Sequence, residues 1–171
     1  EVTEQFSLDR VVPYFQPIMD LEHNAVWRYE CLARLVTPEE QTFLPSDFLH
    51  LVERQQSVAQ LTETIFHRSA EYFRNINVAW NINISQQDIL NDDLPGMLAE
   101  YLKHYSDKRR VCIELTAATA LGDLERFKAF LQLCEQANVG VFIDHFGSAV
   151  GNINTLLELP VCGVKIAGKL I

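Results

Sequence analysis

The sequence lacks an excess of basic residues. It has 14 Lys and Arg residues against 23 Asp and Glu residues, which gives a net charge of −9 over 171 residues. Nonspecific binding to long nucleic acid depends on clustered Lys and Arg, so we exclude long nucleic acid as a partner. A small anionic ligand, held locally by a metal ion and one or two cationic side chains, remains compatible with this charge.

Long apolar runs and paired cysteines are also missing. No apolar run approaches the roughly 18 residues that a membrane span requires, and no charged-then-apolar leader opens the chain. The four cysteines, at positions 31, 112, 134 and 162, form no C-x-x-C pair. Cys31 and Cys112 lie within apolar runs, which indicates reduced core residues and a cytosolic compartment. We therefore expect a cytoplasmic protein, or the cytoplasmic part of a membrane-anchored one.

One stretch organises what is present. Residues 139–143 are β-branched, aromatic or glycine, which is typical of a buried strand. Asp144 and His145 follow this run directly, and Gly147 comes two residues after His145. A carboxylate at this point needs a partner, because leaving it desolvated and unpaired costs several kcal/mol.

The same pattern recurs along the chain. Asn83, Glu114 and Glu30 each lie near the end of a largely apolar run, and Asn83 and Glu114 are 31 positions apart, close to the length of a strand-helix-strand unit. Because parallel strands in such units point the same way, their end residues converge on one rim. Oxygen donors gathered there favour a hard cation such as Mg²⁺, Mn²⁺ or Ca²⁺.

The remaining pattern predicts an α/β fold. Strands are expected at 10–19, 26–35, 79–84, 110–115, 139–143 and 161–166. Helices are expected from Pro45 with Ser46 or Asp47 as cap, at 58–73, from signals at Ser85 and Asp88, and at 94–105, 123–137 and 152–158. Asn138 and Gly140 are expected to end the helix at 123–137. The short gap between the first two strands makes them antiparallel. Six strands cannot close an eight-stranded barrel, so we expect a chain truncated after the sixth strand, or an edge that another chain covers.

Several short motifs carry a resemblance to a known family. Residues 14–18 match an opening Q-P-I strand, residues 30–34 match E-A-L-x-R with Cys31 for Ala, and residues 83–85 match N-x-S. Residues 114–116 match E-x-T, residues 144–147 match D-D-F-G with His145, and 159–161 and 165–166 match the starts of L-P-V-D and K-I-D. The chain resembles the EAL domain of cyclic di-GMP signalling proteins. Residues 1–171 would then form about three quarters of the family's TIM-barrel-like domain, from its N-terminal end.

The resemblance implies a site and a reaction. In the family, two divalent metal ions activate a water that opens cyclic di-GMP to the linear dinucleotide pGpG. By position, a first Mg²⁺ or Mn²⁺ (or Ca²⁺ in crystals) would be held by Glu30, Asn83, Glu114 and Asp144. Glu30 and Lys165 would be catalytic, with Lys165 assisting the water or neutralising the phosphate. The ligand contacts would come from Gln16, Leu32, Arg34 and Asp144.

Departures from the family pattern bear on activity. His145 replaces the second aspartate of D-D-F-G, Ala117 replaces the last Glu of E-x-T-E, and Ala167 replaces the Asp of K-I-D. The loop at 147–151 also lacks a glycine and a tyrosine of the family. Losing a carboxylate raises the electrostatic cost of a second cation, so we expect one metal site rather than two. His145 is either a vestigial residue or a ligand for Mn²⁺ or Zn²⁺.

Three functions stay open on the sequence. The first is a degenerate EAL domain that binds cyclic di-GMP and signals to a neighbouring domain or protein partner, without efficient hydrolysis. The second is a phosphodiesterase that still produces pGpG, with His145 as a ligand. The third is a nucleotide-independent interaction module that uses helix faces, an open edge or the altered loop at 148–152. A homodimer is one of the assemblies that stay open to the chain.

Overall fold

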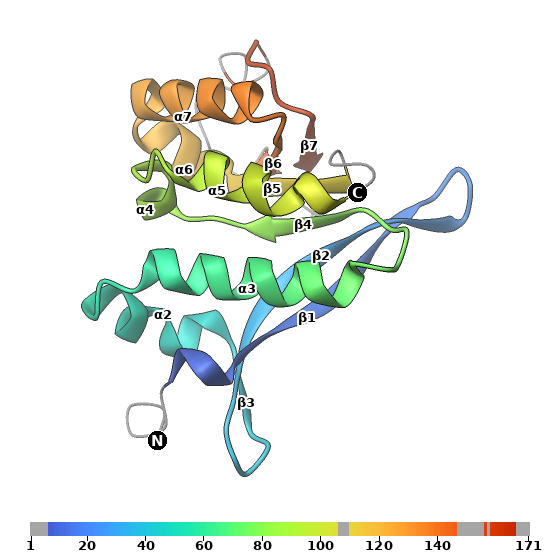
Figure 1. The fold of residues 1–171 in the computed structure, drawn as a ribbon. Coiled ribbons are helices and arrows are strands. Elements are labelled where there is room, and N and C mark those ends of the chain that lie inside the picture. Colours follow the sequence, from blue (N-terminus) through green and yellow to red (C-terminus); the bar gives the residue numbers. More distant parts are fainter. Residues whose placement is uncertain (1–6, 106–109, 147–155, 157, 167–171) are drawn as a thin grey trace. The chain divides into compact units, whose positions relative to one another are not determined.

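A long antiparallel hairpin lies near the start of the described part of the chain. The computed structural model describes residues 7–105, 110–146, 156 and 158–166, which fall into two units, Glu1–Asn83 and Ile84–Ile171 (Figure 1). In the first unit, β1 (Val11–Asp20) pairs with β2 (Ala25–Val36) in antiparallel register, with Gln16 opposite Glu30. The predicted hairpin is therefore confirmed, and the side chains of these two opposed residues share one face of it.

Two more strands flank β2. The short β3 (Thr42–Phe43) pairs antiparallel with its end, and β4 (Trp80–Asn83) pairs with it in parallel. The strand β3 was not predicted, because two residues carry no alternation that a sequence could reveal. β2 thus has hydrogen-bonded neighbours on both edges.

The helices of the first unit lie close to their expected positions. A 3₁₀ turn, η1 (Leu8–Arg10), precedes α2 (Pro45–Arg54) and α3 (Val58–Phe73). The bounds of α3 are those predicted. The expected cap of α2 by Ser46 or Asp47 is wrong, because the helix begins at Pro45 with Leu44 as its N-cap residue. Proline is favoured at the first helical position, and the Asp47 carboxylate accepts the Leu44 N–H at 3.1 Å from inside the first turn.

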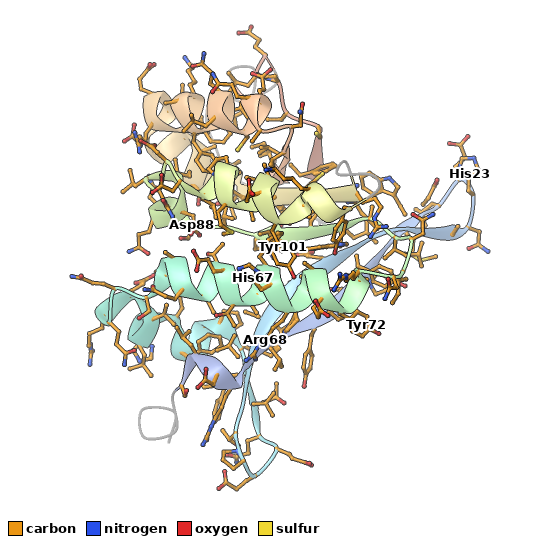
Figure 2. The ribbon with its side chains drawn as sticks, viewed as in Figure 1. His23, His67, Arg68, Tyr72, Asp88 and Tyr101 are labelled. Carbon is orange, nitrogen blue, oxygen red and sulfur yellow. The ribbon has the colours of Figure 1, made fainter. Side chains whose placement is uncertain are left out.

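Helix α3 packs on the hairpin through aromatic rings. The ring centroid of Phe73 lies 4.6 Å from that of Phe15, 5.6 Å from that of Tyr29 and 5.7 Å from that of Trp80. Figure 2 labels Arg68 on the same helix, and its guanidinium donates hydrogen bonds to the backbone carbonyls of Val11 and Asp9. These contacts fix the helix against one face of β1 and β2.

The second unit is built on parallel strands. β5 (Val111–Thr116), β6 (Gly140–Phe146) and β7 (Gly163–Ile166) are adjacent in that order. Its helices are α4 (Gln86–Ile89), α5 (Leu94–Tyr101) with the 3₁₀ turn η2 (Leu102–His104), α6 (Ala117–Gly122) and α7 (Leu124–Gln136). The apolar face of α7, with Phe127, Phe130 and Leu131, is buried as predicted.

The end of α7 departs from the expectation in one respect. Asn138 has a positive φ of 59°, and the N–H groups of Asn138 and Val139 bond to the carbonyls of Glu135 and Cys134. This is the Schellman arrangement with asparagine at the left-handed position. Gly140 takes no part in it and is the first residue of β6, so its predicted role in ending the helix is wrong.

The architecture confirms the predicted α/β class. The described residues contain seven strands rather than six, since β3 adds one. The helix predicted at 152–158 lies largely outside the described residues. Within the described ranges, no helix combines the length and the apolar character that crossing a bilayer would take.

Candidate metal and ligand site

One face of the hairpin carries the residues expected to contact a ligand. Glu30, Leu32 and Arg34 alternate along β2, so they share a face, and Gln16 lies opposite Glu30 on β1. The residues between them face α3, where Cys31 is buried. The strand alternation therefore brings the four predicted residues of the hairpin onto the face away from α3.

The Arg34 guanidinium has a defined position on this face. Its central carbon lies 5.9 Å from the centroid of the Tyr14 ring, at the range of a cation–π contact. One of its terminal nitrogens donates to the Ala33 carbonyl at 2.8 Å. The side chain is only partly buried, so a planar cation is presented at the face that carries Glu30.

Asn83 and Glu30 form a first pair of oxygen-bearing side chains. The Asn83 amide nitrogen Nδ2 donates to the Glu30 carboxylate at 3.1 Å. Because Nδ2 faces the carboxylate, the amide oxygen Oδ1 is the atom left to ligate a cation. The structure thus places two of the four predicted metal ligands in direct contact.

Two polar residues behind this pair were missed by the sequence reasoning. Arg28 is 5% exposed, and its Nε donates to the Asn81 side-chain oxygen at 2.7 Å. Asn81 is the register partner of Glu30 across β2 and β4. Since Arg28 and Asn81 precede Glu30 and Asn83 by two positions each, strand alternation places each on the face of its successor. That period of two was the signal that could have found them.

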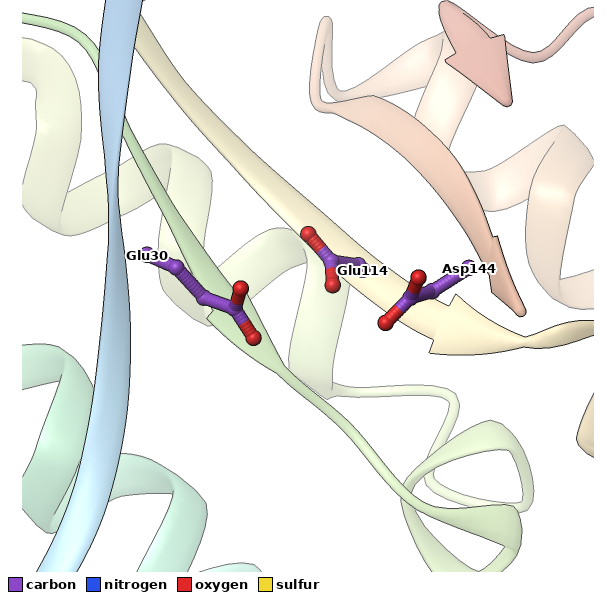
Figure 3. Close-up of side chains that lie close together, drawn as sticks. All are labelled: Glu30, Glu114 and Asp144. Atoms are coloured by element: carbon purple, nitrogen blue, oxygen red, sulfur yellow. The ribbon is translucent and has the colours of Figure 1, made fainter. Parts of the chain in front are cut away.

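Glu114 and Asp144 form a second pair in the second unit. They come from the adjacent parallel strands β5 and β6, where Glu114 is the register partner of Phe142 and Thr116 that of Asp144. An oxygen of one carboxylate lies within 4.8 Å of an oxygen of the other, and Glu114 is fully buried. Figure 3 shows the two side chains close together, Glu114 on β5 and Asp144 on β6. Two carboxylates this close, one of them buried, favour a cation between them.

Cys31 of the signature sequence acts as a core residue. Burial, reinforced by the neighbouring Glu30 charge, raises the pKa of the Cys31 thiol to about 12. The group is therefore a neutral thiol near neutral pH. This agrees with the expectation of a small side chain that replaces alanine.

Some predicted site residues cannot be placed. The backbones of His145 and Lys165 belong to β6 and β7, but their side chains lie outside the described part of the structure. The altered loop at 148–152 also lies outside the described residues. The roles assigned to them remain predictions.

The fold and the polar strand positions together define a class, an α/β protein of the TIM-barrel kind with carboxylates near the ends of parallel strands. The model of the EAL domain family matches residues 1–171. The chain therefore belongs to the EAL domain family, which confirms the resemblance drawn from its motifs.

Relatives with known names are distant in sequence. The signaling protein YkoW of Bacillus subtilis is 25% identical over 176 residues, which cover 98% of this chain and 22% of YkoW. The bifunctional diguanylate cyclase/cyclic di-GMP phosphodiesterase MucR of Pseudomonas aeruginosa is 24% identical over 164 residues, 92% of this chain and 24% of MucR. The chain thus spans less than a quarter of the length of these two relatives.

A solved structure gives the same fold. The FimX EAL domain from Pseudomonas aeruginosa, bound to c-di-GMP, superposes with a TM-score of 0.83 at 22% identity. The match covers 94% of this chain and 67% of the FimX chain. At this identity the likeness establishes the TIM-barrel-like EAL fold.

Proposed function

We propose that this EAL domain binds cyclic di-GMP together with one divalent cation and signals the bound state, with lost or weak hydrolysis. The observation that carries the proposal is the Glu114–Asp144 pair, in which a fully buried carboxylate lies within 4.8 Å of a second one. Two carboxylates this close repel one another, and more strongly where one of them is buried. A hard cation with oxygen ligands would compensate both charges at once.

The Glu30–Asn83 pair would complete the ligand set. Asn83 is the last residue of β4, and the next residue, Ile84, donates its backbone N–H to the Glu114 carbonyl at 2.9 Å. Asn83 is therefore the direct neighbour, along the chain, of a residue that is hydrogen-bonded to β5. Its own side chain donates a hydrogen bond to the Glu30 carboxylate. This connection supports one cation shared by the two pairs.

The donor set suits Mg²⁺ or Mn²⁺. Three carboxylates and an amide oxygen are hard ligands, with room for water and a phosphate oxygen in the remaining positions. When bound, the cation would neutralise the anionic phosphate and polarise its oxygen. The chain's own residues would orient that phosphate on the face of the hairpin.

Arg34, Gln16 and Leu32 would make the other contacts with the dinucleotide. The planar guanidinium of Arg34 matches a phosphate or a guanine edge through two parallel hydrogen bonds. Gln16 is exposed opposite Glu30, and Leu32 lies between Glu30 and Arg34 on the same strand face. These residues would give specificity for a nucleotide rather than for a bare metal ion.

Weak hydrolysis follows from the replaced residues. His145 stands where the family has an aspartate for the second metal ion, so the second cation would have one negative ligand fewer. Lys165 would assist the water or neutralise the phosphate. Relatives more than four times longer than the match support a neighbouring signalling domain as the recipient of the bound state.

Calorimetric titration with cyclic di-GMP tests the binding. We expect saturable heat in Mg²⁺ and weaker binding in a chelator. Arg34→Ala should weaken binding roughly 10- to 100-fold, since a hydrogen bond to a charged group contributes about 1.5–3 kcal/mol. Arg54→Ala, an exposed arginine at the end of α2, is the matched control. Absence of heat in every condition would reject the proposal in favour of a nucleotide-independent interaction module.

A turnover assay separates the receptor from the enzyme. We expect little or no pGpG after incubation of the dinucleotide with the chain and Mn²⁺. Efficient production of pGpG that Glu30→Ala abolishes would establish a phosphodiesterase instead. Glu135→Ala, an exposed residue on α7, controls for the loss of a carboxylate elsewhere.

A further inference from the structure

Two cysteines lie on either side of one glycine in the second unit. Cys112 is the second residue of β5, and Cys162 directly precedes β7. Gly140, the first residue of β6, lies between them and is the register partner of Cys112. The three residues therefore lie on three neighbouring segments of the sheet, near the N-terminal ends of the strands.

The missing side chain of Gly140 lets the two sulfur atoms approach one another. A Cβ atom placed on Gly140 would lie 2.8 Å from the Sγ atom of Cys112 and 2.8 Å from that of Cys162. Twice this distance, 5.6 Å, is the upper limit for the separation of the two sulfur atoms. Gly140 thus leaves a space that both thiols share.

A disulfide does not fit this arrangement. An S–S bond is about 2.05 Å long and requires Cα atoms closer than about 7 Å, whereas strands two apart in a sheet are roughly 9.5 Å apart. Both cysteines are held in place, since Cys112 is in register with Gly140 and the Cys162 N–H bonds to the Val141 carbonyl at 2.7 Å. Closing the bond would require breaking the ladder between these segments.

One soft metal ion fits better. Two metal–thiolate bonds of about 2.3 Å in line span about 4.6 Å, within the limit set by Gly140. Thiolates select soft ions such as Cu(I), which accepts two ligands, whereas structural Zn²⁺ requires four. Among the described side chains, no third His, Cys, Asp or Glu joins these two sulfurs in a metal-sized cluster. The geometry therefore favours a two-coordinate ion.

The thiol pair is separate from the carboxylates. Asp144 is four residues further along β6 than Gly140, about 13 Å at 3.3 Å per residue. The two sites also differ in chemistry, because hard cations prefer oxygen and soft cations prefer sulfur. Cys162 is exposed while Cys112 is buried, so an ion has access from the Cys162 side.

We propose that Cys112 and Cys162 bind one Cu(I) ion between their sulfur atoms, over Gly140. Two S–H bonds are replaced by two S–Cu bonds, two protons leave to solvent, and copper stays in the monovalent state. The site is independent of the proposed binding of cyclic di-GMP.

Competition with a coloured Cu(I) chelator tests the site. The reduced full chain, kept free of oxygen, should withdraw one Cu(I) per molecule from bathocuproine disulfonate. Cys162→Ser should abolish this withdrawal, and Cys112→Ser should do the same. Cys134→Ala is the control, because Cys134 is a buried thiol on α7 and should not affect the stoichiometry. Circular dichroism shows whether each variant is folded.

Three results would overturn the site. The first is a wild-type chain that withdraws no Cu(I), and the second is a folded Cys162→Ser variant that withdraws as much as the wild type. The third is a Cys112–Cys162 disulfide found by mass spectrometry after mild oxidation, which would contradict the geometry. Zn²⁺ should bind the wild type no better than it binds Cys162→Ser.

Discussion

Replacing Glu114 with glutamine should have opposite effects on stability with and without a metal ion. Glutamine keeps the shape of the side chain and removes its charge. At 4.8 Å, the upper limit of their oxygen separation, and an effective dielectric constant of about 20, two ionised carboxylates repel by about 3.5 kcal/mol. Glu114 is fully buried, so solvent screens little of this repulsion. In a chelator, we expect Glu114→Gln to unfold at a higher temperature than the wild type.

A divalent cation should reverse that order. At a concentration of about 100 times its Kd, a bound ion stabilises the folded wild type by about 2.7 kcal/mol. For a chain of this length, that corresponds to a rise in Tm of roughly 5–10 °C. Glu114→Gln loses one charged ligand, and if its Kd is about 100-fold higher, it gains only about 0.4 kcal/mol at the same concentration.

Thermal unfolding, followed by circular dichroism in chelator, Mg²⁺ and Mn²⁺, measures both effects. Glu135→Gln removes one exposed charge from α7 and should keep the Tm and the full metal-dependent shift of the wild type. The reasoning is refuted if Glu114→Gln gains as many degrees from the metal ion as the wild type does. It is also refuted if the variant is less stable than the wild type in chelator.

Three further predictions concern packing, pH and capping. Gly140→Ala brings a methyl group against two sulfur atoms and should lower the free energy of unfolding, measured in urea, by about 1–3 kcal/mol. Gly96→Ala in α5, with open space around it, should raise it by roughly 0.5–1 kcal/mol. Equal effects of the two substitutions would contradict the crowding at Gly140. The raised pKa of Cys31 means that its contribution to stability is present below pH 9.0 and is lost as the pH rises toward about 12. Urea unfolding above pH 9.0 should therefore show a pH dependence weaker by about 1.4 kcal/mol per unit in Cys31→Ala, and an unchanged slope would reject the shift. Asp123→Ala removes the cap of α7 and should cost about 1 kcal/mol, with no comparable loss expected for Glu135→Ala, an exposed residue in the last turn of the same helix.

The sequence predicted the elements that have a strong period or a clear boundary. The helix α3 has sixteen residues with a continuous apolar stripe, and its predicted bounds coincide with those observed. The helix α6 was missed because its six residues, half of them alanine, follow β5 without a polar break. The start of α6 is marked only by Thr116, whose hydroxyl accepts the Thr119 N–H. In the sequence, a threonine at this position is equally typical of a strand end.

The candidate site divides in the same way. Carboxylates at strand ends were found because an apolar run makes a charge conspicuous, and Glu114 and Asp144 indeed lie together. Arg28 and Asn81 escaped notice because a polar residue within a strand reads as solvent-facing, whereas here each satisfies the other in a buried position. Pairing of this kind depends on register across strands distant in the sequence, which local patterns do not encode.

The register of β2 has a consequence for insertions and deletions. This strand is bonded on both edges, and its alternate residues face either α3 or the side that carries Glu30 and Arg34. Deleting a single residue from the middle of β2 would move every following residue to the opposite face of the strand. The charged side chains beyond the deletion would then point into the aromatic layer against α3, and Leu35 would be exposed. Homologous chains should therefore vary in length at the turn around Asn24 and hold the residue count of β2 constant.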